Sequence, residues 1–177
     1  MWASRSAVSR YALRGFIFVG LEPRGLGAEP KLTPQVEIIL LVVGATQVGY
    51  AKEGIADFGK RLNHYTRFRV EAVRDRAAQK AFVKAGDVVV LLDERGTHLT
   101  SVAFADRLQK WMNAGPKRLI FAVGDAYGFD AEFRAGASFE LALSAMTFPH
   151  DLVRVLFAEQ LYRAFSILRN EPYHREG

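Results

Sequence analysis

Apolar runs and segments of helical periodicity alternate along the chain from residue 36 onward. Near-continuous runs of aliphatic and β-branched residues predict strands that are buried on both faces of a sheet. These runs cover residues 36–43, 87–92 and 118–123. A strand with alternating inward positions is predicted at 68–73, and a further strand at 139–143.

Apolar residues at helical spacing lie between these strands. The spacing predicts helices at residues 51–65, 76–84, 101–113 and 150–168, followed by a tail at 169–177. Strands that alternate with helices indicate a parallel arrangement, because parallel neighbours need a crossover connection. The predicted fold class is α/β, with a mainly parallel sheet and helices on both of its faces.

The last predicted helix is apolar around most of its circumference. Its apolar positions are Leu152, Val153, Val155, Leu156, Phe157, Leu161, Phe165 and Leu168. A helix of this kind needs burial on more than one side. In a domain this small, we expect a second subunit to supply part of that burial.

Charge separates the first 35 residues from the remainder. Residues 1–35 contain five Arg and Lys against two Asp and Glu, whereas residues 36–177 contain 19 against 17. Most of the formal net charge of +5 therefore lies in the extension. Charge alone gives only weak support for nucleic-acid binding by the folded part.

Three interpretations of residues 1–35 remain open. The segment is rich in Arg and Ser and has no acid before Glu22, as in an organellar transit peptide. A second interpretation is a poor secretory signal. A third is that the start codon is assigned too early and the protein begins near Gln35. In each case we exclude residues 1–35 as a non-core extension and expect residues 36–177 to form a single domain.

Several function classes lack their sequence signatures. The chain contains no cysteine, and the spacing of its four histidines does not fit metal ligands, so we expect no metal site. There is no GxGxxG, Walker A or GxSxG motif. No apolar stretch is long enough to cross a membrane, so we expect no membrane partner.

Turn residues follow three of the predicted strands, at 93–96, 124–128 and 144–149. Ligands of open α/β sheets bind beyond the carboxyl ends of the strands. Each segment by itself is typical of an ordinary strand-to-helix turn. Together the three segments predict a pocket whose backbone groups and glycines approach a nucleoside-like cofactor.

The C-terminal region carries a family resemblance. The ordered motifs are LSAMTFPH at 143–150, LVR at 152–154, EQLYRA at 159–164 and PYHR at 172–175, preceded by Leu92-Asp93 with Gly96 and the Gly124–Gly128 loop. From about Val36 to Glu176, the chain resembles the RlmH-type ribosomal RNA methyltransferases of the SPOUT superfamily. The resemblance covers roughly four-fifths of the chain.

The resemblance implies a C-terminal trefoil knot, an obligate homodimer and S-adenosylmethionine as cofactor. The implied reaction is methylation of N3 of a pseudouridine in the intersubunit-bridge stem-loop of large-subunit rRNA, on the assembled ribosome. The residues carried over to the cofactor pocket are Leu92, Gly124, Leu143, Ser144, Ala145, Met146, Thr147 and Phe148.

The predicted catalytic residues are Arg154, Tyr173, His174 and Arg175. Tyr173, His174 and Arg175 combine a stacking ring, a titratable ring and a phosphate-binding fork, which are groups that suit an RNA site. The imide N3–H must lose its proton, so we expect His174 to accept it. We expect Arg154 or Arg175 to stabilise the resulting anion. We further expect that the tail of one subunit completes the pocket of the other.

Two departures from the family pattern are visible. Asp125 stands where the family usually has a second glycine; its carboxylate would either bind a ribose or disfavour the methionine carboxylate of the cofactor. The segment 74–86 is also shorter than its family counterpart, which predicts a trimmed RNA-facing helix.

The alternatives to this reading are a SPOUT methyltransferase of another RNA such as tRNA, a ribosome-binding module without activity, and an unrelated nucleotide-binding α/β protein. The missing phosphate-loop glycines disfavour the last of these. We expect a bacterial cytoplasmic protein, or an organellar one if residues 1–35 are a transit peptide.

Overall fold

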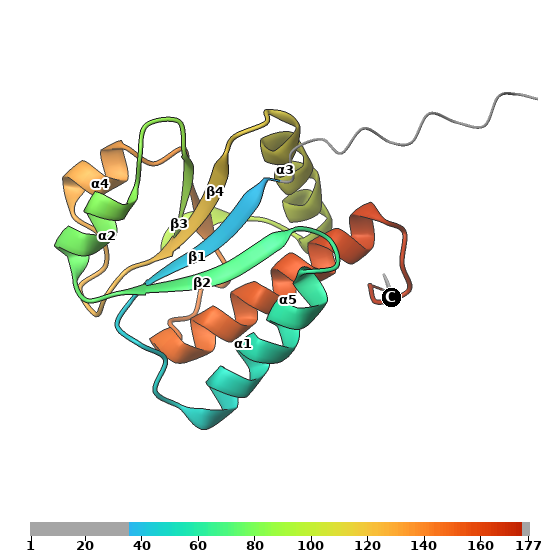
Figure 1. The fold of residues 1–177 in the computed structure, drawn as a ribbon, viewed down its shortest axis with the longest axis horizontal. Helices are drawn as coiled ribbons and strands as arrows, with labels where there is room; N and C mark the ends of the chain where they lie inside the picture. Colours follow the sequence, from blue (N-terminus) through green and yellow to red (C-terminus); the bar gives the residue numbers. More distant parts are fainter. Residues whose placement is uncertain (1–35, 175–177) are drawn as a thin grey trace, which may run out of the picture. The chain divides into compact units, whose positions relative to one another are not determined.

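The computed structural model describes residues 36–174, whose central element is a five-stranded parallel sheet in the order β2-β1-β4-β3-β5 (Figure 1). The strands are β1 (Glu37–Val43), β2 (Arg67–Val73), β3 (Val88–His98), β4 (Arg118–Val123) and β5 (Phe139–Ala142). Every neighbouring pair runs parallel. The predicted mainly parallel sheet is thereby confirmed.

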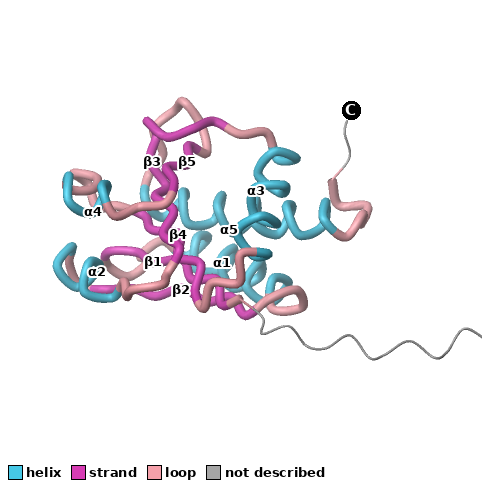
Figure 2. The backbone as a smooth tube through the Cα atoms, turned by 90° about the horizontal axis from the view of Figure 1, so that it is seen from above, coloured by secondary structure: helices cyan, strands magenta, loops and turns pink. Residues whose placement is uncertain are grey.

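Helices cover both faces of this sheet, as predicted. They are α1 (Gly49–Leu62), α2 (Arg76–Phe82), α3 (Ser101–Asn113), α4 (Ala131–Ala135) and α5 (His150–Leu168). In Figure 2, α2 and α4 lie on one side of the strands, and α1, α3 and α5 lie on the other. The short helix α4 has no counterpart among the helices predicted from the sequence.

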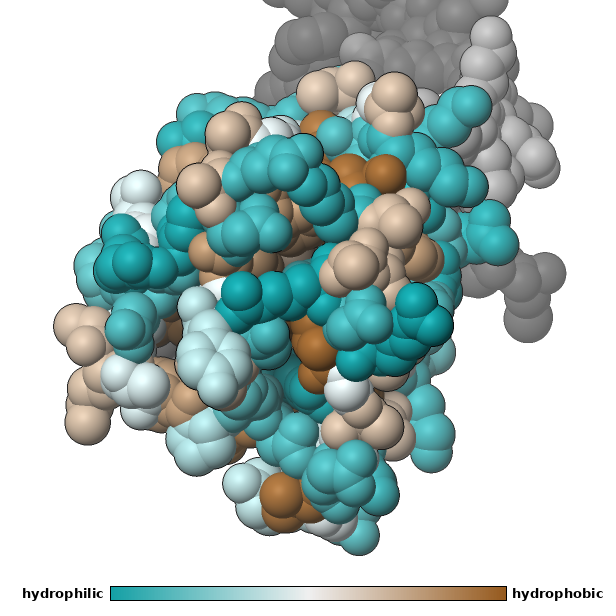
Figure 3. Space-filling view, turned by 90° about the vertical axis from the view of Figure 1, so that its left-hand side faces the viewer, coloured by the Kyte–Doolittle hydropathy of each residue, from teal (hydrophilic) through white to brown (hydrophobic). Residues whose placement is uncertain are grey.

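Alternation along the strands divides the core into two layers. On β1, Ile38, Leu40 and Val42 face the layer under α1, α3 and α5, whereas Ile39 and Leu41 face the opposite layer. Strands buried on both faces carry apolar residues at every position, which explains the continuous runs in the sequence. Figure 3 views the α2 and α4 face, on which hydrophilic side chains predominate.

The ends of α1 differ from the predicted range of 51–65. The helix ends at Leu62 because the Asn63 side chain donates to the Gly59 carbonyl (2.8 Å) and accepts from the Phe68 backbone N–H (3.1 Å). At the other end, the carboxylate of Asp151 accepts from the backbone N–H groups of Gln47 and Val48. A residue 103 positions away along the chain thus binds the backbone at which α1 begins.

The predicted turn at 93–96 is wrong, because these residues belong to β3. β3 pairs with β5 on both sides of the segment, and its register shifts between Leu92 and Thr97. The segment is therefore an irregularity within a strand. Its charged residues are typical of a turn, but in the structure they form contacts within a strand. Asp93 pairs with Arg95 and Arg134, and Glu94 accepts a hydrogen bond from Thr147.

The apolar circumference of α5 finds much of its burial inside the chain. Phe157, Leu161, Ala164 and Phe165 are buried in the larger core layer, to which α1 and α3 also contribute. Leu152, Val155 and Leu156 remain partly exposed. The chain itself therefore supplies much of the burial of α5, and the homodimer stays a prediction.

Residues 1–35 and Arg175 lie outside the described residues, so the predictions that fall on them are not tested here. Among residues 36–174, no helix is long and apolar enough to cross a membrane.

The aromatic cluster under α3 and α5 yields a stability prediction. The Phe121 side chain is fully buried. The centroid of its ring lies 4.5 Å from the ring centroid of Phe157 and 6.0 Å from that of Trp111. We expect Phe121→Ala to lower the free energy of unfolding by about 3–5 kcal/mol, because it removes these contacts and leaves a cavity. Urea denaturation would measure the loss. A similar midpoint for Phe121→Ala and the exposed Tyr50→Ala would contradict the assignment of Phe121 to the core.

Candidate functional site

A cavity of about 370 Å³ lies between the irregular part of β3 and the segments that follow β4 and β5. Its walls come from residues 92–95, 123–129, 143–144 and 146–148, with His150 and Val153 of α5. These are the three segments that the sequence singled out. The volume falls within the range of roughly 300–1,000 Å³ that is usual for small-molecule sites.

Seven of the eight predicted cofactor residues line this one cavity. They are Leu92, Gly124, Leu143, Ser144, Met146, Thr147 and Phe148. Ala145 is exposed and is not part of the lining. The structure thus brings together side chains that are more than fifty positions apart, although their role in binding a cofactor stays a prediction.

Two glycines permit the close backbone contacts at this site. A Cβ on Gly96 would lie 2.7–2.8 Å from backbone atoms of Glu140 and Leu141 on β5. A Cβ on Gly124 would lie 3.0 Å from the backbone of Gly128, across the tip of the loop. Side chains at these positions would push the cavity walls apart.

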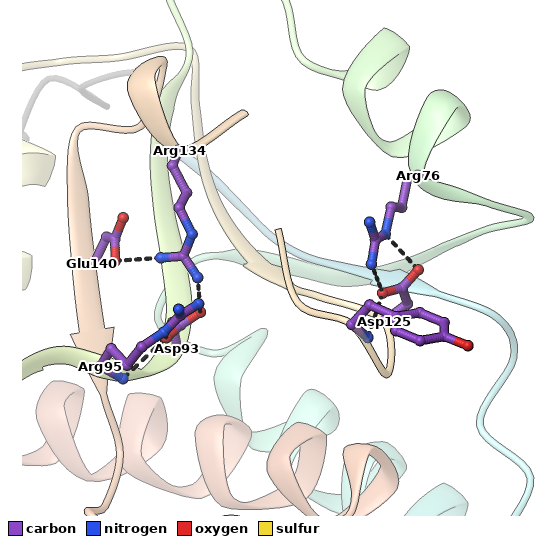
Figure 4. A network of polar contacts seen from close by, with 7 residues as sticks. Arg76, Asp93, Arg95, Asp125, Arg134 and Glu140 are labelled. Atoms are coloured by element: carbon purple, nitrogen blue, oxygen red, sulfur yellow. Dashed lines mark hydrogen bonds and ion pairs between the residues drawn. The ribbon is translucent and has the colours of Figure 1, made fainter. Parts of the chain in front are cut away.

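A buried carboxylate holds the irregular part of β3 in place (Figure 4). The Asp93 side chain is 7% exposed and forms ion pairs with Arg95 (3.1 Å) and Arg134. Arg134 also binds Glu140 of β5 at 2.7 Å. Burial alone would raise the pKa of Asp93, but the hydrogen bonds from Arg95 and Arg134 outweigh it and lower the pKa to about 2.

The segment after β5 is attached to β3 by a second polar contact. The Thr147 hydroxyl donates to the Glu94 carboxylate at 2.6 Å. Within the segment, the Ser144 hydroxyl accepts from the Met146 backbone N–H at 3.0 Å. Three of the predicted cofactor residues are thus fixed by hydrogen bonds at the cavity wall.

Helix α2 holds the loop after β4. Arg76 binds the Asp125 carboxylate through Nε (2.6 Å) and Nη2 (2.5 Å), as Figure 4 shows. One turn later, the buried Gln79 side chain donates to the Val123 carbonyl at 2.9 Å. The hydrogen bonds from Arg76 lower the pKa of Asp125. The charge of Asp125, whose effect on a cofactor was left open, is therefore balanced inside the protein.

The predicted catalytic residue Arg154 is buried, with 3% exposure. Its guanidinium donates to the Val43 carbonyl (3.0 Å) and the Thr46 hydroxyl (2.8 Å), and lies 3.3 Å from Asp151. Burial lowers the pKa of Arg154, partly offset by Asp151. These contacts connect the first turn of α5 to the segment after β1, a placement that favours positioning over direct contact with a substrate.

The predicted residues of the tail lie against α5. The Tyr173 hydroxyl donates to Glu159 (3.1 Å), and the Arg163 guanidinium lies 4.9 Å from the Tyr173 ring centroid. His174 Nδ1 is 3.5 Å from Arg163. Helix α5 spans about 27 Å, and its first residues line the cavity. Tyr173 and His174 therefore lie outside the cavity lining, against the middle and the C-terminal half of α5.

Several residues that shape the cavity were not predicted from the sequence. Arg76, Gln79 and Arg134 hold its walls from outside, and His150 and Val153 belong to its lining. No local signal identified the first three, because each acts on a segment 41 to 49 positions away. His150 and Val153 come from the first turn of α5, which begins without a side-chain cap.

The chemistry of the cavity suits a small polar molecule with a flat apolar part. Aliphatic and aromatic side chains supply part of the walls. The polar and charged groups of the lining come from Asp93, Glu94, Arg95, Asp125, Ser144, Thr147 and His150. The described part of the chain contains no group of three or more His, Asp or Glu arranged to hold a metal ion.

Comparisons with known proteins place this geometry among methyltransferases. The sequence profile of a family described as "Predicted SPOUT methyltransferase" matches residues 36–174. A protein from Parabacteroides distasonis is 43% identical over 157 residues, covering 80% of this chain and 100% of that protein. One from Christiangramia forsetii is 41% identical over 153 residues, covering 77% and 98%. Both are named Ribosomal RNA large subunit methyltransferase H.

A solved structure shares the fold at low sequence identity. It is a probable methylase family protein from Haemophilus influenzae, with a TM-score of 0.50 and 12% identity. The match covers 76% of this chain and 67% of that one. It supports the α/β architecture alone.

The low pKa of Asp93 predicts a pH-dependent contribution to stability. Because the unfolded carboxyl titrates near 3.9 and the folded one near 2, the ion pairs stabilise the fold above about pH 4. Their contribution falls as the pH drops toward 2. We expect Asp93→Asn to cost about 2 kcal/mol at pH 7 and much less near pH 2.

Urea denaturation of both proteins from pH 7 to pH 2 would test this expectation. The exposed Asp106→Asn on α3 is the control, for which we expect a change within about 0.5 kcal/mol at pH 7. A difference between wild type and Asp93→Asn that stays constant with pH would contradict the assignment.

Proposed function

This chain belongs to the SPOUT methyltransferase family, and we propose from that premise that it methylates large-subunit ribosomal RNA with S-adenosylmethionine as methyl donor. The observation that carries the proposal is the convergence of seven predicted cofactor residues on one cavity at the strand ends. The names of the relatives support rRNA as the substrate class.

The residues around the cavity fit this cofactor. Leu92, Leu143 and Phe148 offer apolar surface for an adenine ring, and Ser144 offers a hydroxyl at the same wall. Gly124 leaves room for close approach of the loop backbone. The nearby carboxylate of Glu94 suits a positively charged ligand. When bound, S-adenosylmethionine supplies a methyl group on a sulfonium, which needs positioning more than activation.

The proposed active site is shared between two subunits. Tyr173 and His174 contact Glu159 and Arg163 of α5, whereas the cavity lies at the first turn of that helix. An antiparallel arrangement of two α5 helices would bring the tail of one subunit to the cavity of the other. The partly exposed Leu152, Val155 and Leu156 offer apolar surface for such a homodimer.

The tail supplies the groups that an imide substrate requires. We assign His174 as acceptor of the N3 proton of a pseudouridine, and Arg175 as the cation that stabilises the resulting anion. Tyr173 offers a ring for stacking against a base. The Arg163 and Glu159 side chains hold Tyr173 through its ring and its hydroxyl.

Arg154 takes a positioning role in this proposal. Its guanidinium joins α5 to the Val43 carbonyl at the end of β1 and to Thr46. This contact fixes the first turn of α5, from which His150 and Val153 line the cavity.

The implied trefoil knot belongs to the same proposal. An enzyme of assembled bacterial ribosomes works in the cytoplasm, which is the location we propose.

Transfer of labelled methyl groups to ribosomes is the direct test. We expect incorporation at a single pseudouridine of large-subunit rRNA when the ribosomes come from cells that lack the homologous methyltransferase. Ribosomes that lack the pseudouridine are the control and should accept no label. Labelling of tRNA in place of ribosomes would overturn the proposed substrate, and binding of ribosomes without any transfer would overturn the proposed activity.

Deletion of residues 172–177 tests the shared site. We expect the truncated protein to lose methyl transfer while it retains cofactor affinity, because the tail lies outside the cavity lining. Calorimetric titration with S-adenosylmethionine would measure that affinity. Methyl transfer at the wild-type rate by the truncated protein would show that the tail has no role in the reaction.

Mixing two inactive proteins tests which subunit supplies the tail. The truncated protein keeps an intact cavity, and Gly124→Val keeps an intact tail while its side chain crowds Gly128. Co-refolded mixtures should recover transfer if the tail acts on the partner's cavity. Absence of recovery, with both proteins folded and dimeric, would place the tail in its own subunit's site.

A further inference from the structure

The most exposed large hydrophobic side chain within residues 36–174 lies at the edge of the cavity. The Tyr127 side chain is 89% exposed at the tip of the loop after β4, and it belongs to the cavity lining. Its backbone N–H donates to Asp125 Oδ1 at 2.9 Å, and the Gly128 N–H donates to the Asp125 carbonyl at 2.9 Å. The loop tip is therefore a hydrogen-bonded turn that presents the ring to solvent.

Arg76 supports this ring from helix α2. Its guanidinium carbon lies 5.6 Å from the Tyr127 ring centroid, within the range of a cation–π contact. The same guanidinium is fixed by two hydrogen bonds to Asp125. Asp125 thus orients both members of the pair, because it binds the Tyr127 backbone and the Arg76 side chain at once.

Two further arginines lie near Arg76 or the loop tip, and each is paired with an aspartate. Arg95 is held by Asp93, remains 68% exposed, and reaches to 4.0 Å from the position of a Gly128 Cβ. Arg74, two residues before Arg76, is 85% exposed. The guanidinium groups are paired with carboxylates, so the exposed ring is the main feature that suits an unpaired nucleotide, because it stacks on a base.

We propose that Tyr127, backed by Arg76, is a stacking platform for an unpaired base of the substrate RNA beside the cavity. This proposal rests on the proposed function and adds a specificity element to it. The platform lies outside the tail and belongs to the subunit that supplies the cavity. Each half of the proposed shared site then contacts RNA through its own aromatic ring.

The exposure of the ring favours RNA over the adenine of the cofactor as the stacking partner. A ring that served as a cavity wall would be largely covered by neighbouring side chains, whereas Tyr127 is almost entirely open to solvent. Apolar walls deeper at the strand ends are already supplied by Leu92, Leu143 and Phe148. Tyr127 is therefore placed to meet a large ligand that approaches from outside.

The test compares Tyr127→Ala with Tyr127→Phe. The alanine variant removes the ring, and the phenylalanine variant keeps it while removing the hydroxyl. We expect Tyr127→Ala to weaken ribosome binding about tenfold, because stacking of one base on an aromatic ring has an effect of this order. Tyr127→Phe should bind within about twofold of wild type, since a stacked base needs only the ring.

Arg76→Met tests the support of the ring, and Arg67→Met is its matched control. Arg67 is an exposed arginine at the start of β2, at the edge of the sheet opposite the strand ends that form the cavity. We expect Arg76→Met to weaken ribosome binding and Arg67→Met to leave it unchanged. Melting temperatures of all variants would show that each is folded.

Two measurements on each dimeric protein separate the possible outcomes. Co-sedimentation with ribosomes from cells lacking the homologous methyltransferase gives the RNA affinity, and calorimetry with S-adenosylmethionine gives the cofactor affinity. Weaker ribosome binding by Tyr127→Ala with unchanged cofactor affinity supports the platform. Weaker cofactor binding with unchanged ribosome affinity would assign the ring to the cofactor and overturn the proposal, as would no change in either.

The same measurements distinguish failure of the platform from failure of the proposed function. If wild type transfers methyl groups and Tyr127→Ala does so with unchanged KM for ribosomes, only the platform is wrong. If wild type binds ribosomes through Tyr127 but transfers nothing, only the proposed activity is wrong. If wild type neither binds nor methylates ribosomes, the proposed function fails and the platform is overturned with it.

Discussion

Helix α5 is the element on which both halves of the proposed site depend. It packs on one face of the sheet together with α1 and α3, and Phe157 and Leu161 anchor it in the larger core layer. Its first turn lines the cavity, and its last turns hold the tail. Because a helix is a rigid rod, one buried element sets the distance between the cavity and the tail. That distance is the physical basis for a site shared between two subunits.

Carboxylates paired with arginines hold the cavity from the outside. Asp93 fixes the irregular part of β3 to Arg134, and Asp125 fixes the loop after β4 to Arg76. Asp151 binds the backbone before α1, and Arg154 binds the carbonyl at the end of β1. The segments at the strand ends are irregular, so their backbone cannot be fixed by sheet hydrogen bonds alone. Charged side chains from neighbouring elements provide the missing constraints and leave the backbone inside free to face a ligand.

The loop after β4 illustrates how a carboxylate beside the cavity is accommodated. A carboxylate at position 125 next to a cofactor cavity would be unfavourable for an anionic ligand group. Arg76 neutralises it through two hydrogen bonds, and α2 is itself attached to the sheet through Gln79. The short segment 74–86 forms a helix of seven residues, and that helix carries the arginine and the glutamine. The short segment 74–86 therefore supplies two side chains, Arg76 and Gln79, that hold the loop after β4.

The sequence by itself determined the α/β class, the five strands, four of the five helices and most of the cavity lining. Burial on two faces leaves continuous apolar runs, and the carboxyl ends of parallel strands meet at one edge, so both features can be inferred locally. The resemblance to the SPOUT family could also be recognised locally, because it rests on motifs of contiguous residues. Only the tertiary structure decided that residues 93–96 continue a strand, that Arg154 is buried and binds the Val43 carbonyl, and that Tyr173 packs on α5 outside the cavity lining. These properties depend on pairings between residues up to 111 positions apart, and such pairings leave no periodic trace in the sequence.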